Sequence, residues 1–210
     1  MLRQETVEKR TLDLIKLLMK DDVLMSFNLV GGTALALKLG HRKSIDIDLF
    51  TISDFNSTDI ATHLSSTYQA KRIQTIANGV FCFVKGIKID LLAHKYPLLE
   101  NIVTIDGIRM ISLLDIGSMK LNAIYDNGSR IKDFIDLYIL LEHFSLAELL
   151  EANEKKYPGN NSSMIKNSLI YFEDVDFSVP IDFLGPAIKW ALIADRLKRA
   201  FNSPRIKFGP

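Results

Sequence analysis

Three aspartates interrupt two of the most apolar short segments of this chain. Asp46 and Asp48 alternate with apolar residues in the segment 45–50, and Asp90 lies between isoleucine and leucine in the segment 88–92. Residues two apart on a strand project from the same face, so this spacing predicts that the first two carboxylates point the same way while the intervening apolar residues face the core. Because aspartate is disfavoured in strands, its presence in both segments indicates that these carboxylates have a functional role.

Carboxylates held this close favour a bound cation, because two anions repel each other unless a positive charge lies between them. Mg²⁺ prefers oxygen ligands and commonly binds one or two carboxylates together with substrate phosphates, and Mn²⁺ shares that preference. If Asp90 lies on a strand beside Asp46 and Asp48, three carboxylates suffice for two metal ions that activate a hydroxyl and stabilise displacement at phosphorus. These three aspartates are our candidate catalytic and metal-binding residues, and simple polar alternation on a half-exposed strand is the alternative.

A glycine turn precedes the aspartates. Gly31, Gly32 and Thr33 follow the apolar segment 27–30 and lead into the helix-forming segment 34–39. Glycines between a strand and a helix let a phosphate approach the backbone, and the helix N-terminus supplies N–H donors. A plain tight turn would use the same residues, but the position just ahead of the acidic segment favours a phosphate site.

Together these motifs resemble the signature of the AbiEii/AbiGii toxin family of nucleotidyltransferases, within the polymerase-beta-like superfamily. The resemblance is carried by residues 31–35 and 42–50. It implies that the glycine turn binds the nucleotide triphosphate, that the Asp-x-Asp segment binds the metal, and that Asp90 is the third carboxylate. Arg42 and Ser44 match the Arg-x-Ser motif before the acidic segment, where an arginine can balance phosphate charge. An ordinary solvated loop is the other interpretation of this basic stretch.

Two later segments are similar to the remaining motifs of that family. Lys120 begins a Lys-x-x-Ala segment, and Asp133 and Asp136 belong to a basic-Asp-x-x-Asp-Leu segment. The resemblance implies that Lys120 contacts nucleotide phosphates and that Asp136 or Asp133 orients the nucleotide or the lysine. Exposed ion pairs of Lys132 with Asp136 and Arg130 with Asp133 would explain the same charges structurally.

Hydrophobic periodicity predicts an α+β fold, in which a mixed sheet with flanking helices precedes a helical C-terminal half. Strands are expected at 27–30, 45–50, 72–77, 80–84 and 87–93. Helices are expected at 5–20, 34–39, 57–68, 112–125, 130–143, 146–156, 164–172 and 187–201. We expect residues 1–110 to form a nucleotidyltransferase-like α/β core and residues 111–210 to form a helical domain that completes the nucleotide site and binds an acceptor or partner.

The amino-acid composition limits the classes of protein to which this chain can belong. The formal charge of +1, from 26 basic and 25 acidic residues, provides no global field for nucleic acid or membrane binding. The single Cys82 excludes an internal disulfide framework, and the chain has neither a long apolar stretch nor an apolar leader, so we expect a cytoplasmic protein without membrane association. A local cationic excess near the C-terminus could bind an RNA backbone or be a solvated face; it comprises Lys189, Arg196, Lys198, Arg199, Arg205 and Lys207.

The motifs favour a magnesium-dependent nucleotidyltransferase that moves a nucleoside monophosphate from an NTP to an RNA, such as tRNA, or to a protein. The family resemblance further implies the toxin of a toxin–antitoxin pair, with a cognate antitoxin as partner. The alternative is a non-catalytic nucleotide- or metal-binding module whose helical half recruits a partner. Such a module has no need of three aspartates, a glycine turn and Lys120 together, so we favour the enzyme.

Overall fold

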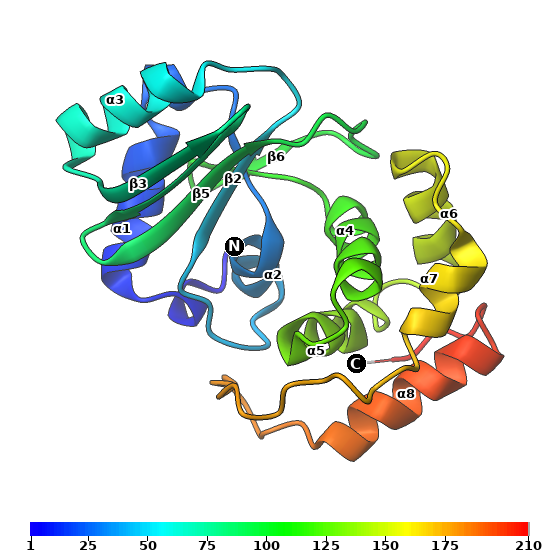
Figure 1. Ribbon diagram of the computed structural model, residues 1–210. Coiled ribbons are helices and arrows are strands. Elements are labelled where there is room, and N and C mark those ends of the chain that lie inside the picture. The colour runs from blue at the N-terminus through cyan, green and yellow to red at the C-terminus, as the bar shows by residue number, and fades with distance from the viewer. Residues whose placement is uncertain (210) are drawn as a thin grey trace. The chain divides into compact units, whose positions relative to one another are not determined.

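A computed structural model describes residues 1–209, which form two compact units. The first unit comprises Met1–Pro97 and Ile102–Ile111, and the second comprises Leu98–Asn101 and residues 112–209. The first unit carries a mixed sheet with helices and the second is helical (Figure 1). The predicted α+β class is therefore confirmed.

Within residues 1–209, the strands of the first unit form one seven-stranded sheet in the order β3-β4-β5-β2-β1-β7-β6. The strands are β1 (Asn28–Leu29), β2 (Ile47–Thr51), β3 (Lys71–Ile76), β4 (Gly79–Val84), β5 (Ile87–Ala93), β6 (Val103–Ile105) and β7 (Ile108–Met110). The pairs β2/β5 and β1/β7 are parallel and the other pairs are antiparallel, which makes the sheet mixed as predicted. The helical elements of this unit are η1 (Gln4–Thr6), α1 (Lys9–Met19), η2 (Asp22–Leu24), α2 (Gly31–Leu39) and α3 (Ser57–Tyr68).

Alternation along the central strands separates a buried face of the sheet from a half-open one. The buried face consists of apolar residues from three adjacent strands, namely Ile47, Leu49, Val80, Cys82, Val84, Ile89 and Leu91. The other face carries Asp48 on β2 opposite Asp90 on β5, which in turn lies opposite Phe81 on β4. Helix α3 packs against β3 and β4. The fold therefore commits one face to the core and leaves the acidic face available for chemistry.

Two features of this unit differ from expectation. Strands β6 and β7 were not predicted, although Asp106-Gly107 between them is a strong hairpin signal and both residues have the positive φ that such a turn requires, 53° and 78°. The prediction that Ile45 faces the core is also wrong. Ile45 is 58% exposed and, with Asp46, it precedes β2 instead of belonging to it.

The second unit consists of α4 (Leu113–Asp126), α5 (Ile131–Leu140), α6 (Leu146–Lys156), α7 (Ser162–Ser168) and α8 (Trp190–Asn202). The predicted helix 164–172 is shorter and begins earlier because Asn161 caps it, its side chain accepting bonds from the N–H groups of residues 163 and 164. Apolar residues from all five of these helices share one core with Phe208 in the chain after α8. No helix within residues 1–209 has the length and apolar character needed to cross a membrane.

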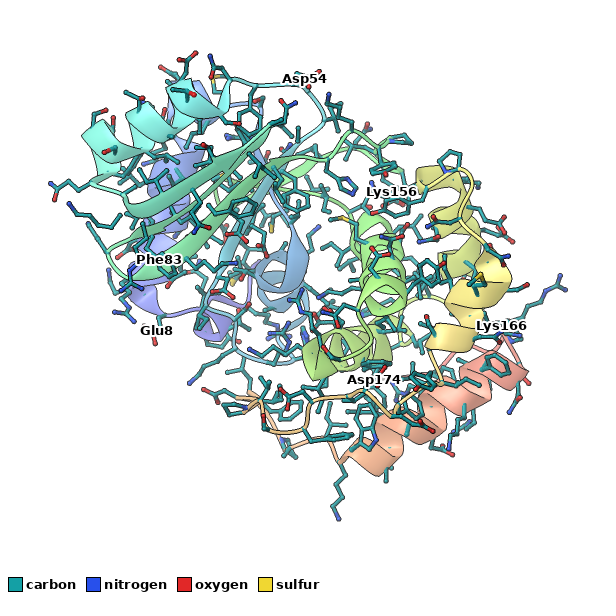
Figure 2. The ribbon with its side chains drawn as sticks, viewed as in Figure 1. Glu8, Asp54, Phe83, Lys156, Lys166 and Asp174 are labelled. Carbon is teal, nitrogen blue, oxygen red and sulfur yellow. The ribbon has the colours of Figure 1, made fainter. Side chains whose placement is uncertain are left out.

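A buried ion pair joins three segments of the second unit. Lys156, at the end of α6 (Figure 2), donates to Asp115 Oδ1 at 2.8 Å, and both side chains are almost fully buried. Asp115 also accepts bonds from the Ser112 hydroxyl and from the backbone N–H groups of Leu99 and Glu100. This network ties the short segment 98–101 to the helical unit.

The C-terminal cations are partly used within the protein. The Arg196 guanidinium lies 3.7 Å from the centre of the Tyr138 ring and donates to Glu142 Oε1 at 2.7 Å. Lys207 donates to Glu148 Oε1 at 2.9 Å. These bonds weaken the interpretation of the C-terminal segment as a continuous RNA-binding patch, because two of its charges already balance carboxylates.

We expect Arg109 on β7 to be a stability determinant of the first unit. Its guanidinium donates to the carbonyl oxygens of Met19, Leu24 and Phe27, at 2.7 to 3.3 Å. Replacing Arg109 with Met leaves these acceptors without their donor and should lower the free energy of unfolding by roughly 2 to 4 kcal/mol. The exposed Arg10 is the matched control, and urea denaturation showing equal losses for both methionine variants would contradict this assignment.

Candidate active site

The Gly31 backbone lies against the Asp48 carboxylate where α2 begins. Gly31 has φ +67°, and a Cβ atom at this position would come within 2.6 Å of Asp48 Oδ2. The Val30 N–H donates to the Asp48 carbonyl oxygen at 2.9 Å, which holds the two segments together. Only glycine satisfies both the left-handed backbone and the close approach. The predicted glycine turn and acidic segment therefore meet in the folded chain.

The residues next to this contact form a compact network. The Thr33 hydroxyl donates to the Asp46 carbonyl oxygen at 2.5 Å and lies 2.8 Å from Ser44 Oγ. Thr33 is buried, whereas the Asp46 residue is exposed. Thr33 and Ser44 thus fix the backbone from which Asp46 projects, which is a positioning role that the sequence alone did not indicate.

Arg42 is buried against the second glycine of the turn. It is only 3% exposed, and a Cβ atom on Gly32 would come within 2.6 Å of Arg42 Nη2. One guanidinium nitrogen also donates to the Lys43 carbonyl oxygen at 3.1 Å. The interpretation of this stretch as an ordinary solvated loop is therefore wrong for Arg42, while the neighbouring Lys43 is exposed.

Asp90 faces Asp48 across the parallel β2/β5 pair and is contacted by a residue that was not predicted. Lys88 Nζ donates to Asp90 Oδ2 at 2.6 Å, while Asp90 Oδ1 is buried with no hydrogen-bond partner among residues 1–209. Burial lowers the pKa of Lys88, but the bond and the charge of Asp90, aided by Asp46 and Asp48, raise it overall. Lys88 therefore stays charged. Its two-residue spacing from Asp90 on one strand was the signal that could have identified it.

The donor set suits a hard cation. A buried carboxylate oxygen without a partner is costly unless a positive group reaches it, and Asp90 Oδ1 lies on the same face as Asp48. Among residues 1–209, however, no three His, Cys, Asp or Glu side chains are already grouped to hold a metal. Mg²⁺ bound by one or two carboxylates and by substrate phosphates would fit this arrangement, with Asp48 and Asp90 as the central pair.

The predicted residues Lys120 and Asp136 belong to the second unit, whereas the other predicted site residues belong to the first. Lys120 Nζ lies 2.5 Å from Asp133 Oδ1 and 2.6 Å from Asp136 Oδ2, and the two aspartates are buried. The alternative of an exposed pair is therefore wrong for Asp136. Arg130 Nε is 3.5 Å from Asp133 Oδ2, but Asp133 itself is buried. Lys120 orients two carboxylates, and its contact with phosphate stays a prediction.

Comparisons with known proteins agree with the first half of the chain as a nucleotidyltransferase unit. Residues 16–88 match the family described as "Nucleotidyl transferase AbiEii toxin, Type IV TA system". An uncharacterized protein of Aquifex aeolicus, aq_aa25, is 37% identical over 154 residues, which cover 70% of this chain and 74% of that protein. The matched family segment contains the glycine turn and the first acidic pair, and it ends just before Asp90.

Two solved structures are similar to this chain over nearly its whole length. A structure from H. pylori described as a nucleotidyltransferase has a TM-score of 0.56 at 19% identity, covering 93% of this chain and 94% of that chain. JHP933 from Helicobacter pylori has a TM-score of 0.54 at 19% identity, covering 93% and 92%. At this level of identity the similarity establishes a shared fold.

A pair of glycine variants can isolate the contact with Asp48. Gly31→Ala places a Cβ atom against the Asp48 carboxylate in a left-handed backbone, whereas Gly86→Ala meets the same backbone restriction, φ +80°, with no atom within 4 Å. The strained left-handed backbone alone should lower the free energy of unfolding of each variant by about 1 to 2 kcal/mol. In urea denaturation, we expect the free energy of unfolding to fall measurably more for Gly31→Ala than for Gly86→Ala. Equal losses would show that the approach to Asp48 is not structurally constrained.

Lys120→Met should destabilise the second unit. It leaves Asp133 and Asp136 buried without their shared counter-charge, which typically costs about 3 to 5 kcal/mol. The triple variant that also converts both aspartates to asparagine removes the uncompensated charge and should recover most of that loss. Thermal denaturation of the single and the triple variant tests this prediction. An unchanged melting temperature for the single variant Lys120→Met would contradict a structural ion pair.

Proposed function

Because this chain belongs to the AbiEii nucleotidyl transferase family, we propose that it transfers a nucleoside monophosphate from an NTP to a hydroxyl-bearing acceptor, with Asp46, Asp48 and Asp90 at the reacting centre. The observation that carries the proposal is the close approach of Gly31 to Asp48, in register with Asp90. A glycine backbone admits phosphate, and two facing carboxylates suit a phosphate-bound cation.

Different residues of the first unit have separate roles in the proposed reaction. The backbone of Gly31 and Gly32 receives the phosphates, and Arg42 against Gly32 supplies positive charge to them. Asp90 Oδ1, buried and without a protein donor, is placed to take the proton from the attacking hydroxyl. A bound divalent ion would lower the pKa of that hydroxyl and stabilise charge at phosphorus. The new bond forms at the α-phosphorus as the bond to pyrophosphate breaks.

The identity of the acceptor and the biological role also belong to this proposal. We infer RNA, such as tRNA, as the acceptor, with a protein as the alternative, and a toxin role with a cognate antitoxin partner. The toxin role and the antitoxin partner rest on the family description, which names a toxin and a type IV system. The acceptor is our inference from the resemblance of the motifs to that family. Cys82, buried and free of a disulfide, fits the cytoplasmic location we propose. Lys120 and Asp136 would contribute phosphate binding from the second unit.

One observation favours a second function, a non-catalytic module that binds nucleotide or metal. The described residues hold no preassembled group of three metal ligands, and Lys120 is already engaged by two buried aspartates. A module of this kind would bind NTP with magnesium but release no pyrophosphate. Pyrophosphate release therefore separates the two functions.

Asp48→Asn and, separately, Asp46→Asn should abolish transfer while leaving the protein folded. Each substitution keeps the side-chain shape but removes a charge needed to bind the metal. Purified protein is incubated with each labelled NTP, magnesium and total cellular RNA, and labelled products and pyrophosphate are measured. Asp13→Asn, an exposed carboxylate paired with Lys9 on α1, is the matched control and should behave as wild type. Unimpaired transfer by Asp48→Asn would remove this residue from the reaction.

A further inference from the structure

We propose that the half-open face of strands β3, β4 and β5 binds the single-stranded end of an RNA acceptor, an inference that rests on the proposed nucleotidyl transfer. The surface, here called the sheet platform, consists of Arg72, Phe81, Phe83 and Lys88. Its two rings would stack on the terminal bases, and Arg72 would contact a phosphate, while Lys88 is already bound to Asp90. The platform begins beside Asp90, so an RNA lying on it would bring its terminal hydroxyl to the carboxylates.

Strand register places the two rings on the acidic face. Phe81 pairs directly with Asp90 and Phe83 with Lys88, and directly paired residues of antiparallel strands share a face. Neighbouring strands are about 4.8 Å apart, and residues two apart on a strand are separated by about 6.7 Å. Both phenylalanines are half-buried, whereas the residues between and beside them, Cys82 and Val84, face the core. The rings are therefore placed within one nucleotide's reach of the carboxylates.

The cations of the platform are positioned beside these rings. The Arg72 guanidinium lies 5.7 Å from the centre of the Phe83 ring, and Arg72 is exposed. It occupies a break in the β3/β4 register between Lys71 and Gln74, with a φ of 51°. Such bulges re-aim side chains, which explains how an edge-strand arginine reaches over the ring. Lys88, whose side chain is 46% exposed, is paired with Asp90 at 2.6 Å, so Arg72 is the platform cation that we expect to contact phosphate.

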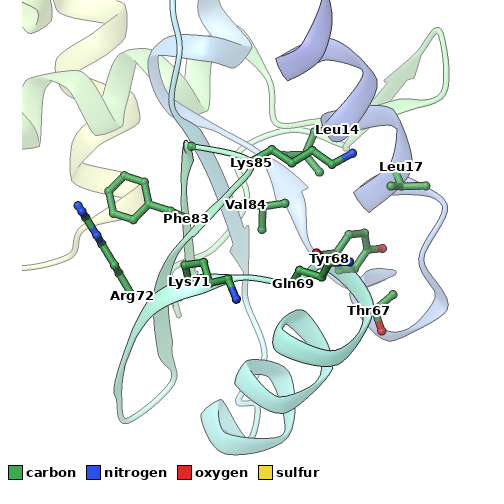
Figure 3. Close-up of a pocket in the computed structure, with 11 residues that line it drawn as sticks. Leu14, Leu17, Thr67, Tyr68, Gln69, Lys71, Arg72, Phe83, Val84 and Lys85 are labelled. Carbon is green, nitrogen blue, oxygen red and sulfur yellow. The ribbon is translucent and has the colours of Figure 1, made fainter.

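The opposite side of the same hairpin has a different character. A cavity of about 710 Å³ lies at this end of the hairpin, and its lining includes Arg72 and Phe83 of the platform as well as Leu14, Leu17 and Lys85. Figure 3 shows Phe83 and Arg72 projecting to one side of the strands and the latter three residues to the other. Lys85 thus offers a cation of the same hairpin that does not belong to the platform.

Alternating aromatic rings and cations are the chemistry that single-stranded nucleic acids require. Bases stack on aromatic side chains whatever their sequence, and arginine adds cation–π contact and phosphate binding. A duplex hides its base faces and would use only Arg72. An acidic peptide has no bases to stack on Phe81 and Phe83, so single-stranded RNA is the occupant that uses both rings and the arginine.

Binding is measured by fluorescence anisotropy of a labelled single-stranded RNA of about 12 nucleotides, over a series of salt concentrations and without NTP. Phe83→Leu should weaken binding on the order of tenfold by removing one stacking surface. Arg72→Gln should reduce the slope of log affinity against log salt by about 0.7, the effect of one phosphate contact on a single strand. Lys85→Gln is the matched control and should leave both the affinity and the slope close to the wild-type values.

A second measurement covers the case in which Phe83→Leu does not fold. Phe83→Trp keeps an aromatic ring, and its fluorescence should be quenched when RNA is added, while the native Trp190 signal in the wild type should stay unchanged. Absence of quenching, or weakening by Lys85→Gln equal to that by Arg72→Gln, would overturn the platform. Binding of duplex RNA as tight as that of single strands would overturn it as well.

The same proteins separate this inference from the proposed function. If wild type transfers label from an NTP to protein and binds no RNA, nucleotidyl transfer stands and the platform is wrong. If no NTP yields pyrophosphate or product with any acceptor, the proposed function fails, while the anisotropy and quenching data still decide whether the platform binds RNA. Loss of RNA labelling by Phe83→Leu, with NTP binding unchanged, would support both.

Discussion

Parallel pairing of β2 with β5 places Asp48 directly opposite Asp90, and this repulsion between two neighbouring carboxylates constrains the rest of the first unit. Gly31 supplies a backbone without a side chain where the Asp48 carboxylate needs room. Lys88 neutralises one oxygen of Asp90 and leaves the other buried without a donor. The core beneath cannot relax the pairing, because shifting either strand by one residue would turn its buried apolar residues outward. The fold therefore holds two like charges at fixed separation.

The second unit also buries carboxylates, but it pairs them with lysine side chains. Lys120 is shared by Asp133 and Asp136, and Lys156 binds Asp115. The second oxygen of Asp133 makes no hydrogen bond among residues 1–209 but lies 3.5 Å from Arg130 Nε. Buried ion pairs seldom add stability over apolar packing, but losing one member is costly. Satisfied charges of this kind fix the geometry of a helical unit. Asp90 Oδ1, by contrast, is buried without a hydrogen bond among residues 1–209 and lies on a strand that places it directly opposite a second carboxylate, Asp48, which is why chemistry is assigned to the sheet.

The sequence contained much of this arrangement because its strongest signals are local. Period-two alternation predicted β2, and β-rich runs between turn signals predicted β4 and β5. The helix expected at 34–39 begins earlier, at Gly31, because the glycines belong to its first turn. Local patterns could not show that Ile45 is exposed, because alternation alone does not mark where pairing begins. The roles of Lys88 and Arg72 depend on strand register and on a bulge, which arise only when distant segments pair. The hairpin of β6 and β7 was missed despite its Asp-Gly turn because its strands are only three residues long.

Charge at the sheet site indicates what a substrate must bring with it. The described side chains there are three carboxylates, Asp46, Asp48 and Asp90, against the two cations Arg42 and Lys88, so the site is negative before any phosphate arrives. A triphosphate adds further negative charge, and hydrogen bonds from Gly31 and Gly32 would not offset that repulsion in a partly desolvated setting. Entry of the nucleotide together with divalent cations removes the conflict. The proposed dependence on a divalent ion is therefore supported by the electrostatics of these residues as well as by their resemblance to a family.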